Sequence, residues 1–212
     1  PLGSVLSVGA IYTVGPYLFP RLVPGINQLA PEMPMYLEEN YTADLRVKLS
    51  SGALDAIFVA LPFTEPEVVT RSLFDEPFVV MMPRDHSMAK QSTIAPTALA
   101  EHKVLLMGEG HCFRDQVLEA CPGLQESIVA HNARDHTVVE GSSLDTLKHM
   151  VASGMGITVL PESAANIALY SEHDLVVRPF QEPSPYRTIA LAWRVSYPRP
   201  QVIDLLVEAL KD

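Results

Sequence analysis

The chain has 212 residues, of which 48% are hydrophobic and 19% are charged, so most of it must form a packed interior. A set of 15 basic and 25 acidic residues gives a formal net charge of −10. This charge repels a phosphate backbone and argues against nucleic-acid binding by the chain alone. No apolar run reaches the roughly 18 residues that a membrane helix needs. The composition predicts one large or two small soluble domains.

The cysteine content and the start of the chain bear on where the protein works. Two cysteines are too few for a secreted disulfide scaffold, and no signal-like segment opens the sequence, so we expect a cytoplasmic protein. Residues 1–4, Pro1-Leu2-Gly3-Ser4, are typical of the remnant of an expression tag. Because a strand is expected directly after them, we expect the natural N-terminus to lie further upstream.

The first third of the sequence alternates between apolar strands and helices. The short apolar runs that predict strands cover residues 5–13, 35–39 and 56–61. The first helix between them is expected to start at Pro16 and to be irregular, because Pro20 and Pro24 lie inside it. The second helix is expected to have Thr42 as its N-cap and to end at Gly52. Strands that alternate with helices in this way form a parallel sheet.

The rest of the chain continues the alternation. Further strands are expected over residues 75–83, 104–107, 137–140, 157–160, 175–180 and 188–194. Helices or helical turns are expected over residues 96–101, 113–120, 144–153 and 200–211, and one more is expected to open at Pro161. Ser142 and Ser143 are the candidate N-caps of the third of these segments.

This order of elements predicts an α/β fold of two lobes. The last strand needs an open position in a sheet, so we expect it to return to the first lobe, with crossovers near residues 76 and 181. The predicted division is lobe I, residues 5–75 and 182–212, and lobe II, residues 76–181. Two such lobes enclose a cleft, and ligands bind at clefts of this kind.

The segment from Met107 to Cys121 contains both cysteines, at the two ends of a predicted helix. At a rise of ~1.5 Å per residue, that helix holds the Cα atoms of Cys112 and Cys121 roughly 13 Å apart. A disulfide requires a Cα separation below about 7 Å. The two cysteines can therefore bond only if the helix unwinds, so that oxidation becomes a conformational change.

Cys112 lies where the helix should begin, beside His111 and Arg114, and each of these features favours the thiolate. A thiolate can attack a peroxide to give a sulfenic acid, and Cys121 is the only other thiol that could condense with it. Asp115 should oppose ionisation of the sulfur. If it pairs with Arg114, or supplies a proton to the leaving oxygen, it becomes useful instead.

Two other interpretations of the cysteines remain open on the residues alone. Both cysteines can be small buried hydrophobic residues with no chemical role. A metal site could use thiolate and imidazole ligands from His111, Cys112, Cys121 and His131, but their spacing matches no standard zinc pattern. The glycines of GMGITVLP do not follow the order of a dinucleotide-binding loop, and no hydrolase triad is indicated.

The segment GEGHCFRDQVLEAC resembles the redox segment of the OxyR family, the hydrogen-peroxide sensors among the LysR-type transcription regulators. Three further stretches, GAIYTVGPYLFPRL, LSSGALDAIFVALPF and HMVASGMGITVLP, resemble the regulatory domain of that family. The resemblance implies two Rossmann-like lobes joined by two crossover strands, as in periplasmic binding proteins. It also implies that dimers assemble into tetramers on operator DNA, through an N-terminal winged helix-turn-helix that this chain lacks.

Residue roles follow from the same resemblance. It implies that hydrogen peroxide oxidises Cys112, which then forms a disulfide with Cys121. The residues expected to line the peroxide pocket are Thr13, Thr42, His111, Arg114 and Asp115. Hydroxyl groups can both donate to and accept from a peroxide oxygen, although without the resemblance Thr42 is an ordinary N-cap and Thr13 the end of a strand.

We therefore predict the regulatory domain of a peroxide sensor, which is not an enzyme and uses no cofactor or metal. A cytoplasmic dithiol system would reduce it again, and its other partners would be a second copy of the chain and, in the whole protein, operator DNA. One alternative is a LysR-type domain that binds a small organic effector without redox chemistry. The other is a thiol peroxidase, which would turn over peroxide continuously.

Overall fold

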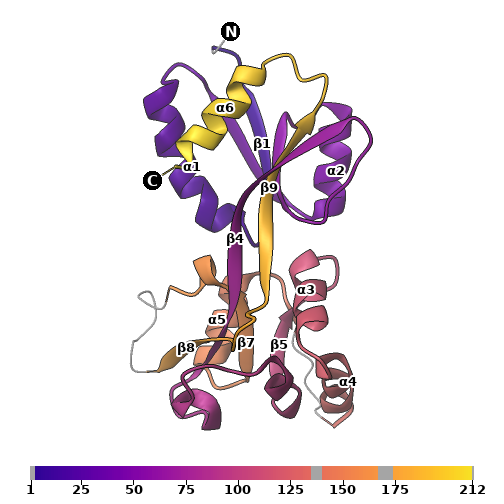
Figure 1. Ribbon diagram of the computed structural model, residues 1–212, viewed down its shortest axis with the longest axis vertical. Helices are drawn as coiled ribbons and strands as arrows, with labels where there is room; N and C mark the ends of the chain where they lie inside the picture. The colour runs from indigo at the N-terminus through magenta and orange to yellow at the C-terminus, as the bar shows by residue number, and fades with distance from the viewer. Residues whose placement is uncertain (1–2, 135–139, 167–173, 212) are drawn as a thin grey trace. The chain divides into compact units, whose positions relative to one another are not determined.

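The computed structural model describes residues 3–134, 140–166 and 174–211. The chain forms two compact units. Unit 1 comprises the residues up to Asp75 together with those from Thr188 onward, and unit 2 is Glu76–Arg187. Two strands, β4 (Val68–Pro83) and β9 (Tyr186–Arg194), belong partly to each unit (Figure 1). Where the chain leaves and re-enters unit 1, the Thr188 hydroxyl donates to Oδ1 of Asp75 at 2.6 Å.

The second boundary differs from the predicted one. Residues 182–187 were expected in lobe I, whereas the structure includes them in unit 2. The reason is a long-range contact, because Arg187 forms an ion pair with Glu76 inside unit 2, at 2.9 Å. A sequence pattern cannot reveal a pairing between residues so far apart.

The sheet of unit 1 has the strand order β2-β1-β3-β9-β4. Its first three strands are β1 (Leu6–Ile11), β2 (Met35–Asn40) and β3 (Ala56–Ala60). Strand β1 pairs in parallel with both β2 and β3, as the alternation of strands and helices predicted. Strand β9 pairs antiparallel with β3, which confirms that the last strand returns to the first part of the chain.

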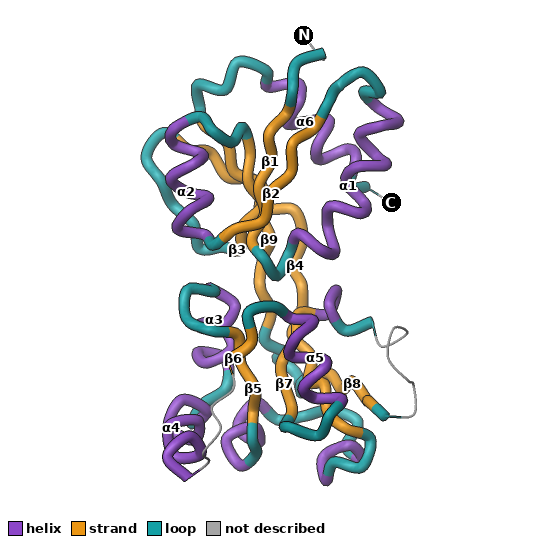
Figure 2. The backbone as a smooth tube through the Cα atoms, turned by 180° about the vertical axis from the view of Figure 1, so that it is seen from behind, coloured by secondary structure: helices purple, strands orange, loops and turns teal. Residues whose placement is uncertain are grey.

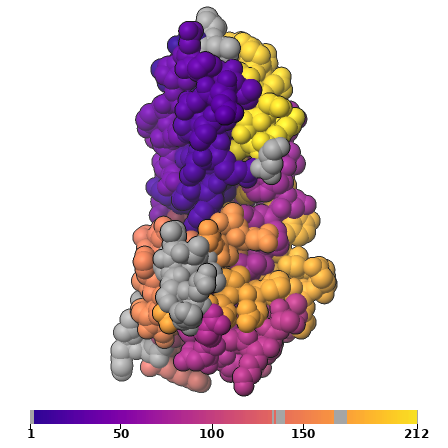
Figure 3. Space-filling view, turned by 90° about the vertical axis from the view of Figure 1, so that its left-hand side faces the viewer, coloured from indigo at the N-terminus to yellow at the C-terminus, as the bar shows by residue number. Residues whose placement is uncertain are grey.

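Three helices cover this sheet, with α1 (Gly15–Leu29) and α6 (Pro200–Ala209) on one side and α2 (Thr42–Ser51) on the other (Figure 2). Helices α1 and α6 pack against one another (Figure 3). Helix α1 is continuous although Pro20 and Pro24 lie inside it. Both prolines lie on its exposed face, opposite the buried stripe that includes Leu18, Leu22 and Ile26.

The prediction that Thr42 caps helix α2 is wrong. The N-cap is Tyr41, whose backbone is extended (φ −68°, ψ 152°), and Thr42 is the first helical residue. The carbonyl of Tyr41 accepts the first helical hydrogen bond from the amide of Leu45 at 2.9 Å. At the other end, Gly52 has the left-handed conformation expected of a helix stop (φ 83°).

The sheet of unit 2 has the order β8-β4-β7-β5-β6. The strands other than β4 are β5 (Val104–Met107), β6 (Glu140–Gly141), β7 (Ile157–Pro161) and β8 (Leu175–Pro179). Strands β7 and β8 both pair antiparallel with β4, whereas β5 is parallel to β6 and β7. Of the predicted strand 137–140, residues 137–139 lie outside the described residues.

The helical elements of unit 2 lie between and around these strands. They are the 3₁₀ segments η1 (Ser87–Lys90), η2 (Pro96–Glu101) and η3 (Glu162–Ala164) and the helices α3 (Cys112–Ala120), α4 (Leu124–Arg134) and α5 (Leu144–Ala152). Ser143 caps α5 as predicted, because its hydroxyl accepts from the amide of Thr146 at 3.1 Å. Helix α4 was not predicted. In the described part of the chain, no helix is long and apolar enough to cross a membrane.

Candidate functional site

The two cysteines lie at the two ends of helix α3, as the sequence predicted. Gly110 turns the chain in the left-handed conformation (φ 94°), and His111 is the extended N-cap residue before Cys112. Cys121 is the C-cap, and its amide donates to the carbonyl of Val117 at 3.1 Å. Both cysteines are in the reduced form, outside any disulfide. The intact helix holds their Cα atoms roughly 13 Å apart, too far for a disulfide.

The environments of the two thiols differ. Cys112 is part-exposed, whereas Cys121 is 1% exposed. Burial raises the pKa of the Cys121 thiol from 9.0 to about 12, because a thiolate is poorly solvated in an apolar interior. Cys112 is therefore the more accessible of the two thiols, while Cys121 remains a protonated thiol as long as the helix is intact.

His111 does not supply the positive charge that the sequence suggested. Its side chain is 6% exposed, and desolvation lowers the pKa of the imidazole below its usual 6.5. The ring is therefore neutral at neutral pH. Any electrostatic support that Cys112 receives must come from other groups.

Arg114 and Asp115 lie in the first turn of α3, but they do not pair with one another. The guanidinium of Arg114 donates to the carbonyl of Met107 at 2.8 Å and lies 3.8 Å from the carboxylate of Glu140. Asp115 is exposed. Arg114 thus links the first turn of α3 to the last residue of β5 and the first residue of β6, and the Asp115 carboxylate is open to solvent.

Thr13 and Thr42 belong to unit 1, whereas the cysteines belong to unit 2. Thr13 is 2% exposed and lies in the turn after β1, where the amide of Val14 donates to the carbonyl of Ile11 at 3.0 Å. Thr42 is half-buried at the start of α2. In the parallel ladder Ile11 lies opposite Asn40. Thr13 follows Ile11 by two residues, and Thr42 follows Asn40 by two residues. The two threonines therefore follow neighbouring strand ends, and their part in a peroxide pocket stays a prediction.

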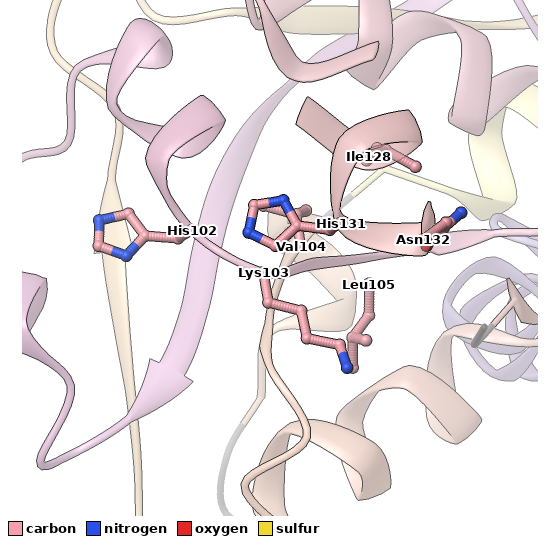
Figure 4. A pocket seen from close by; sticks show the side chains of 7 residues that line it. All are labelled: His102, Lys103, Val104, Leu105, Ile128, His131 and Asn132. Atoms are coloured by element: carbon pink, nitrogen blue, oxygen red, sulfur yellow. The ribbon is translucent and has the colours of Figure 1, made fainter. Parts of the chain in front are cut away.

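His131, the fourth ligand of the metal-site alternative, is engaged elsewhere. Its Nδ1 lies 2.8 Å from the carbonyl oxygen of Ser127, one turn earlier in α4. The ring lines a small pocket of about 20 Å³ together with His102 and Lys103, whose ammonium group points away from both rings (Figure 4). Within the described residues, no group of three or more His, Cys, Asp or Glu side chains could hold a metal ion.

Comparison with known proteins agrees with this architecture. The family model described as the LysR substrate binding domain matches residues 1–212. The chain belongs to this LysR family. Its α/β fold, with two units joined by two strands, is the regulatory-domain fold of LysR-type proteins. The prediction of this fold class is therefore confirmed.

Several relatives of this LysR domain are peroxide regulators. The DNA-binding transcriptional dual regulator OxyR of Escherichia coli K12 is 37% identical over 211 residues, which are 99% of this chain and 66% of that protein. The reduced form of the OxyR regulatory domain from Pseudomonas aeruginosa is 52% identical, with a TM-score of 0.88 and coverage of 99% and 96% of the two chains. A reduced OxyR from Neisseria meningitidis is 40% identical, with a TM-score of 0.86 and coverage of 97% and 94%. This LysR domain spans just under two thirds of the length of the curated relatives it matches.

One buried ion pair beside helix α3 of the LysR domain was not predicted from the sequence. Nε and Nη2 of Arg187 both lie 2.9 Å from Oε1 of Glu76, and Oε2 of Glu76 accepts from the amide of Ser163 at 3.1 Å. The guanidinium of Arg187 also lies over the ring of Phe113, 5.3 Å from its centroid. A permanent positive charge is thus buried against the residue that follows Cys112. The only signal in the sequence was one charged residue in or beside each of two predicted strands. Glu76 lies in the predicted strand over residues 75–83, and Arg187 directly precedes the predicted strand over residues 188–194.

Proposed function

We propose that this chain is the regulatory domain of a peroxide-sensing, LysR-type transcription regulator of the OxyR kind. The observation that carries the proposal is the placement of the only two thiols at opposite ends of one helix, with Cys112 part-exposed and Cys121 buried. The similarity to regulators whose names describe hydrogen peroxide-inducible activation supports it.

The chemistry has two steps. The Cys112 thiolate attacks one oxygen of hydrogen peroxide, the O–O bond breaks, and the departing hydroxide takes up a proton and leaves as water. The resulting sulfenic acid is attacked by the sulfur of Cys121, which gives up its proton as the S–O bond breaks and a second water leaves. Two thiols and one peroxide thus give one disulfide and two waters.

The second step requires helix α3 to unwind. Its nine residues separate the cysteines beyond the reach of a disulfide, so the oxidised chain must repack this segment. Unwinding also exposes Cys121, whose high pKa in the buried state disfavours the attacking thiolate. Oxidation therefore selects a second conformation, which we propose changes the assembly of two or four copies of the chain.

Five residues complete the proposed peroxide site: Thr13, Thr42, His111, Arg114 and Asp115. The neutral imidazole of His111 can either accept or donate a hydrogen bond, and the exposed carboxylate of Asp115 can exchange protons with solvent. The resemblance of the redox segment to the OxyR family supports this assignment.

The remaining partners follow from the same proposal. Operator DNA would be bound by a part of the whole protein outside this chain, because the charge of −10 opposes contact with phosphates. The domain would work in the cytoplasm, where a dithiol reductant would reset it. As a sensor rather than an enzyme, it would react once for each reduction.

Treatment with one equivalent of peroxide tests the proposal. We expect a peptide that links Cys112 to Cys121 in mass spectrometry, together with a loss of helical circular dichroism. The Cys112→Ser variant should show neither change. Two free thiols in the unsubstituted chain after this treatment would refute the proposal.

The description of the matching family as a substrate binding domain favours one alternative, a domain that responds to a small organic effector. A metabolite that raises the melting temperature equally in the unsubstituted chain and in Cys112→Ser would support that function. Sustained consumption of peroxide in the presence of a dithiol would instead indicate a thiol peroxidase.

A further inference from the structure

Two tyrosines make an edge-to-face contact at the ends of the first two strands. The ring centroids of Tyr12 and Tyr41 are 5.2 Å apart, and the rings are inclined at 78°. Tyr12 follows Ile11, the last residue of β1, and Tyr41 follows Asn40, the last residue of β2. Because Ile11 and Asn40 are partners in the parallel ladder, this tyrosine pair continues the strand register for one residue beyond the ladder.

The next residue along each chain segment is a threonine of the proposed peroxide site. At this point the backbone can no longer hold the two segments in register by ladder hydrogen bonds. After Tyr12 the chain turns, with the amide of Val14 bonded to the carbonyl of Ile11, and after Tyr41 it enters helix α2. The ring contact between the tyrosines is therefore a side-chain link across the two turns that carry Thr13 and Thr42.

We propose that Tyr12 and Tyr41 are positioning residues, which fix the spacing of the Thr13 and Thr42 hydroxyl groups for a peroxide molecule. This inference rests on the proposed function. Two hydroxyls can bind both oxygens of one small molecule only if their separation is held within a fraction of an ångström, and small errors of placement cost large factors in rate. An aromatic edge-to-face contact has a defined geometry, which suits it to this task.

The contact uses the rings rather than the phenolic hydroxyls, and this distinction makes the inference testable. Tyr41 is 37% exposed and Tyr12 is half-buried, so substitutions at either position leave the core of unit 1 intact. Tyr41→Phe keeps the ring contact, whereas Tyr41→Ala removes it. A matched control is Tyr36→Ala, which removes a 52% exposed tyrosine near the start of β2, away from the threonines.

The experiment measures the second-order rate constant for oxidation of Cys112 by peroxide in the full chain, and in parallel the rate of its alkylation by iodoacetamide. We expect Tyr41→Ala to slow oxidation at least tenfold while alkylation stays within twofold of the unsubstituted chain. Tyr41→Phe and Tyr36→Ala should oxidise within twofold of it. Normal oxidation of Tyr41→Ala, or an equal loss in both rates, would overturn the inference.

A double-variant comparison tests whether Tyr41 acts through the threonines. Thr42→Val should slow oxidation by itself, and adding Tyr41→Ala to it should slow the reaction by less than a further twofold. If the two losses multiply, the tyrosine acts independently and the inference is wrong. Failure of the proposed function would look different, because the unsubstituted chain would then form no disulfide with peroxide, and the inference would fall with it.

Discussion

The guanidinium of Arg187 lies 5.3 Å from the ring centroid of Phe113, the residue that follows Cys112. The same guanidinium is held by Glu76 through two contacts of 2.9 Å. Phe113 also packs edge-to-face on Phe78 of β4, with ring centroids 5.1 Å apart. The first turn of α3 thus packs on both strands that pass between the units.

Removing one member of this buried ion pair should be strongly destabilising. Glu76→Ala leaves the Arg187 charge buried without its partner, and we expect a loss of about 3–5 kcal/mol in the free energy of unfolding. Urea denaturation measures this loss in the free energy of unfolding. The control is Asp204→Ala, which removes an exposed partner of Arg71 at 3.7 Å and should change the free energy by less than about 1 kcal/mol. Equal losses of the free energy of unfolding in Glu76→Ala and Asp204→Ala would contradict the expectation that burial makes the Glu76–Arg187 pair the more important one.

The buried thiol of Cys121 should make stability depend on alkaline pH. Its pKa is about 12 in the folded chain against 9.0 for an ordinary thiol, so the unfolded chain loses this proton first. The stabilising contribution is complete below pH 9 and is lost between pH 9 and 12, at about 1.4 kcal/mol per pH unit.

This dependence is measured by urea denaturation under reducing conditions at pH 8 and pH 10. Other groups titrate in the same range, so the comparison is with Cys121→Ala. The unsubstituted chain should lose about 1 kcal/mol more than the variant between the two pH values. If the unsubstituted chain and Cys121→Ala lose equal amounts of the free energy of unfolding, the Cys121 thiol is more accessible to solvent than its burial indicates.

His111 should remain neutral down to mildly acidic pH. Desolvation lowers its pKa from 6.5, so the folded chain binds a proton at this site less readily than the unfolded chain does. The stabilising contribution is present above pH 6.5 and is lost as the pH falls through the folded pKa. An NMR titration of the His111 ring should give a midpoint below 6.5, and His111→Gln should weaken the loss of stability on acidification. A midpoint above 6.5 would restore the charged role suggested by the sequence.

The speed of disulfide formation should depend on the stability of α3. Glu119 is an exposed residue of this helix, and Glu119→Gly costs about 1 kcal/mol of helix propensity, whereas Glu119→Ala costs nothing. If α3 must unwind before the sulfenic acid condenses, the glycine variant should form the disulfide about fivefold faster than the alanine variant, since 1.4 kcal/mol corresponds to a factor of 10.

The rate of disulfide formation is obtained from the lifetime of the Cys112 sulfenic acid, which is measured by trapping this acid with a dione reagent. The initial reaction with peroxide should be the same in both Glu119 variants, because it precedes unwinding. Equal lifetimes would mean that the helix opens readily and does not limit the second step.

The parts of the structure that the sequence predicted well carry local signals. Pro96 opens η2, Ser143 caps α5 and Gly52 ends α2, and each is a residue whose backbone or side chain favours that position. The expected helix over residues 113–120 agrees with α3 to within one residue, and glycines in the left-handed conformation, Gly110 and Gly123, flank it.

The parts that were missed depend on contacts distant in sequence. Helix α4 has a weak apolar pattern, and it is stabilised by packing on η2, where the Ser127 hydroxyl donates to the carbonyl of Ala100 at 2.6 Å. The neutral state of His111 depends on its burial by the folded chain. Thr42 was assigned as an N-cap because its residue type fits that role, but the extended backbone of Tyr41 starts the helix one residue earlier.

The hydrogen bond between Asp75 and Thr188 joins the two places where the chain leaves and re-enters unit 1. Topologically, unit 2 is therefore an insertion whose two ends start side by side on unit 1. A short turn between Asp75 and Thr188 would close unit 1 into a smaller protein with a mixed sheet, because β9 pairs antiparallel with β3. Unit 2 in turn needs only two adjacent strand ends to be inserted elsewhere. Such an arrangement allows the inserted unit to change without redesign of the sheet that carries it.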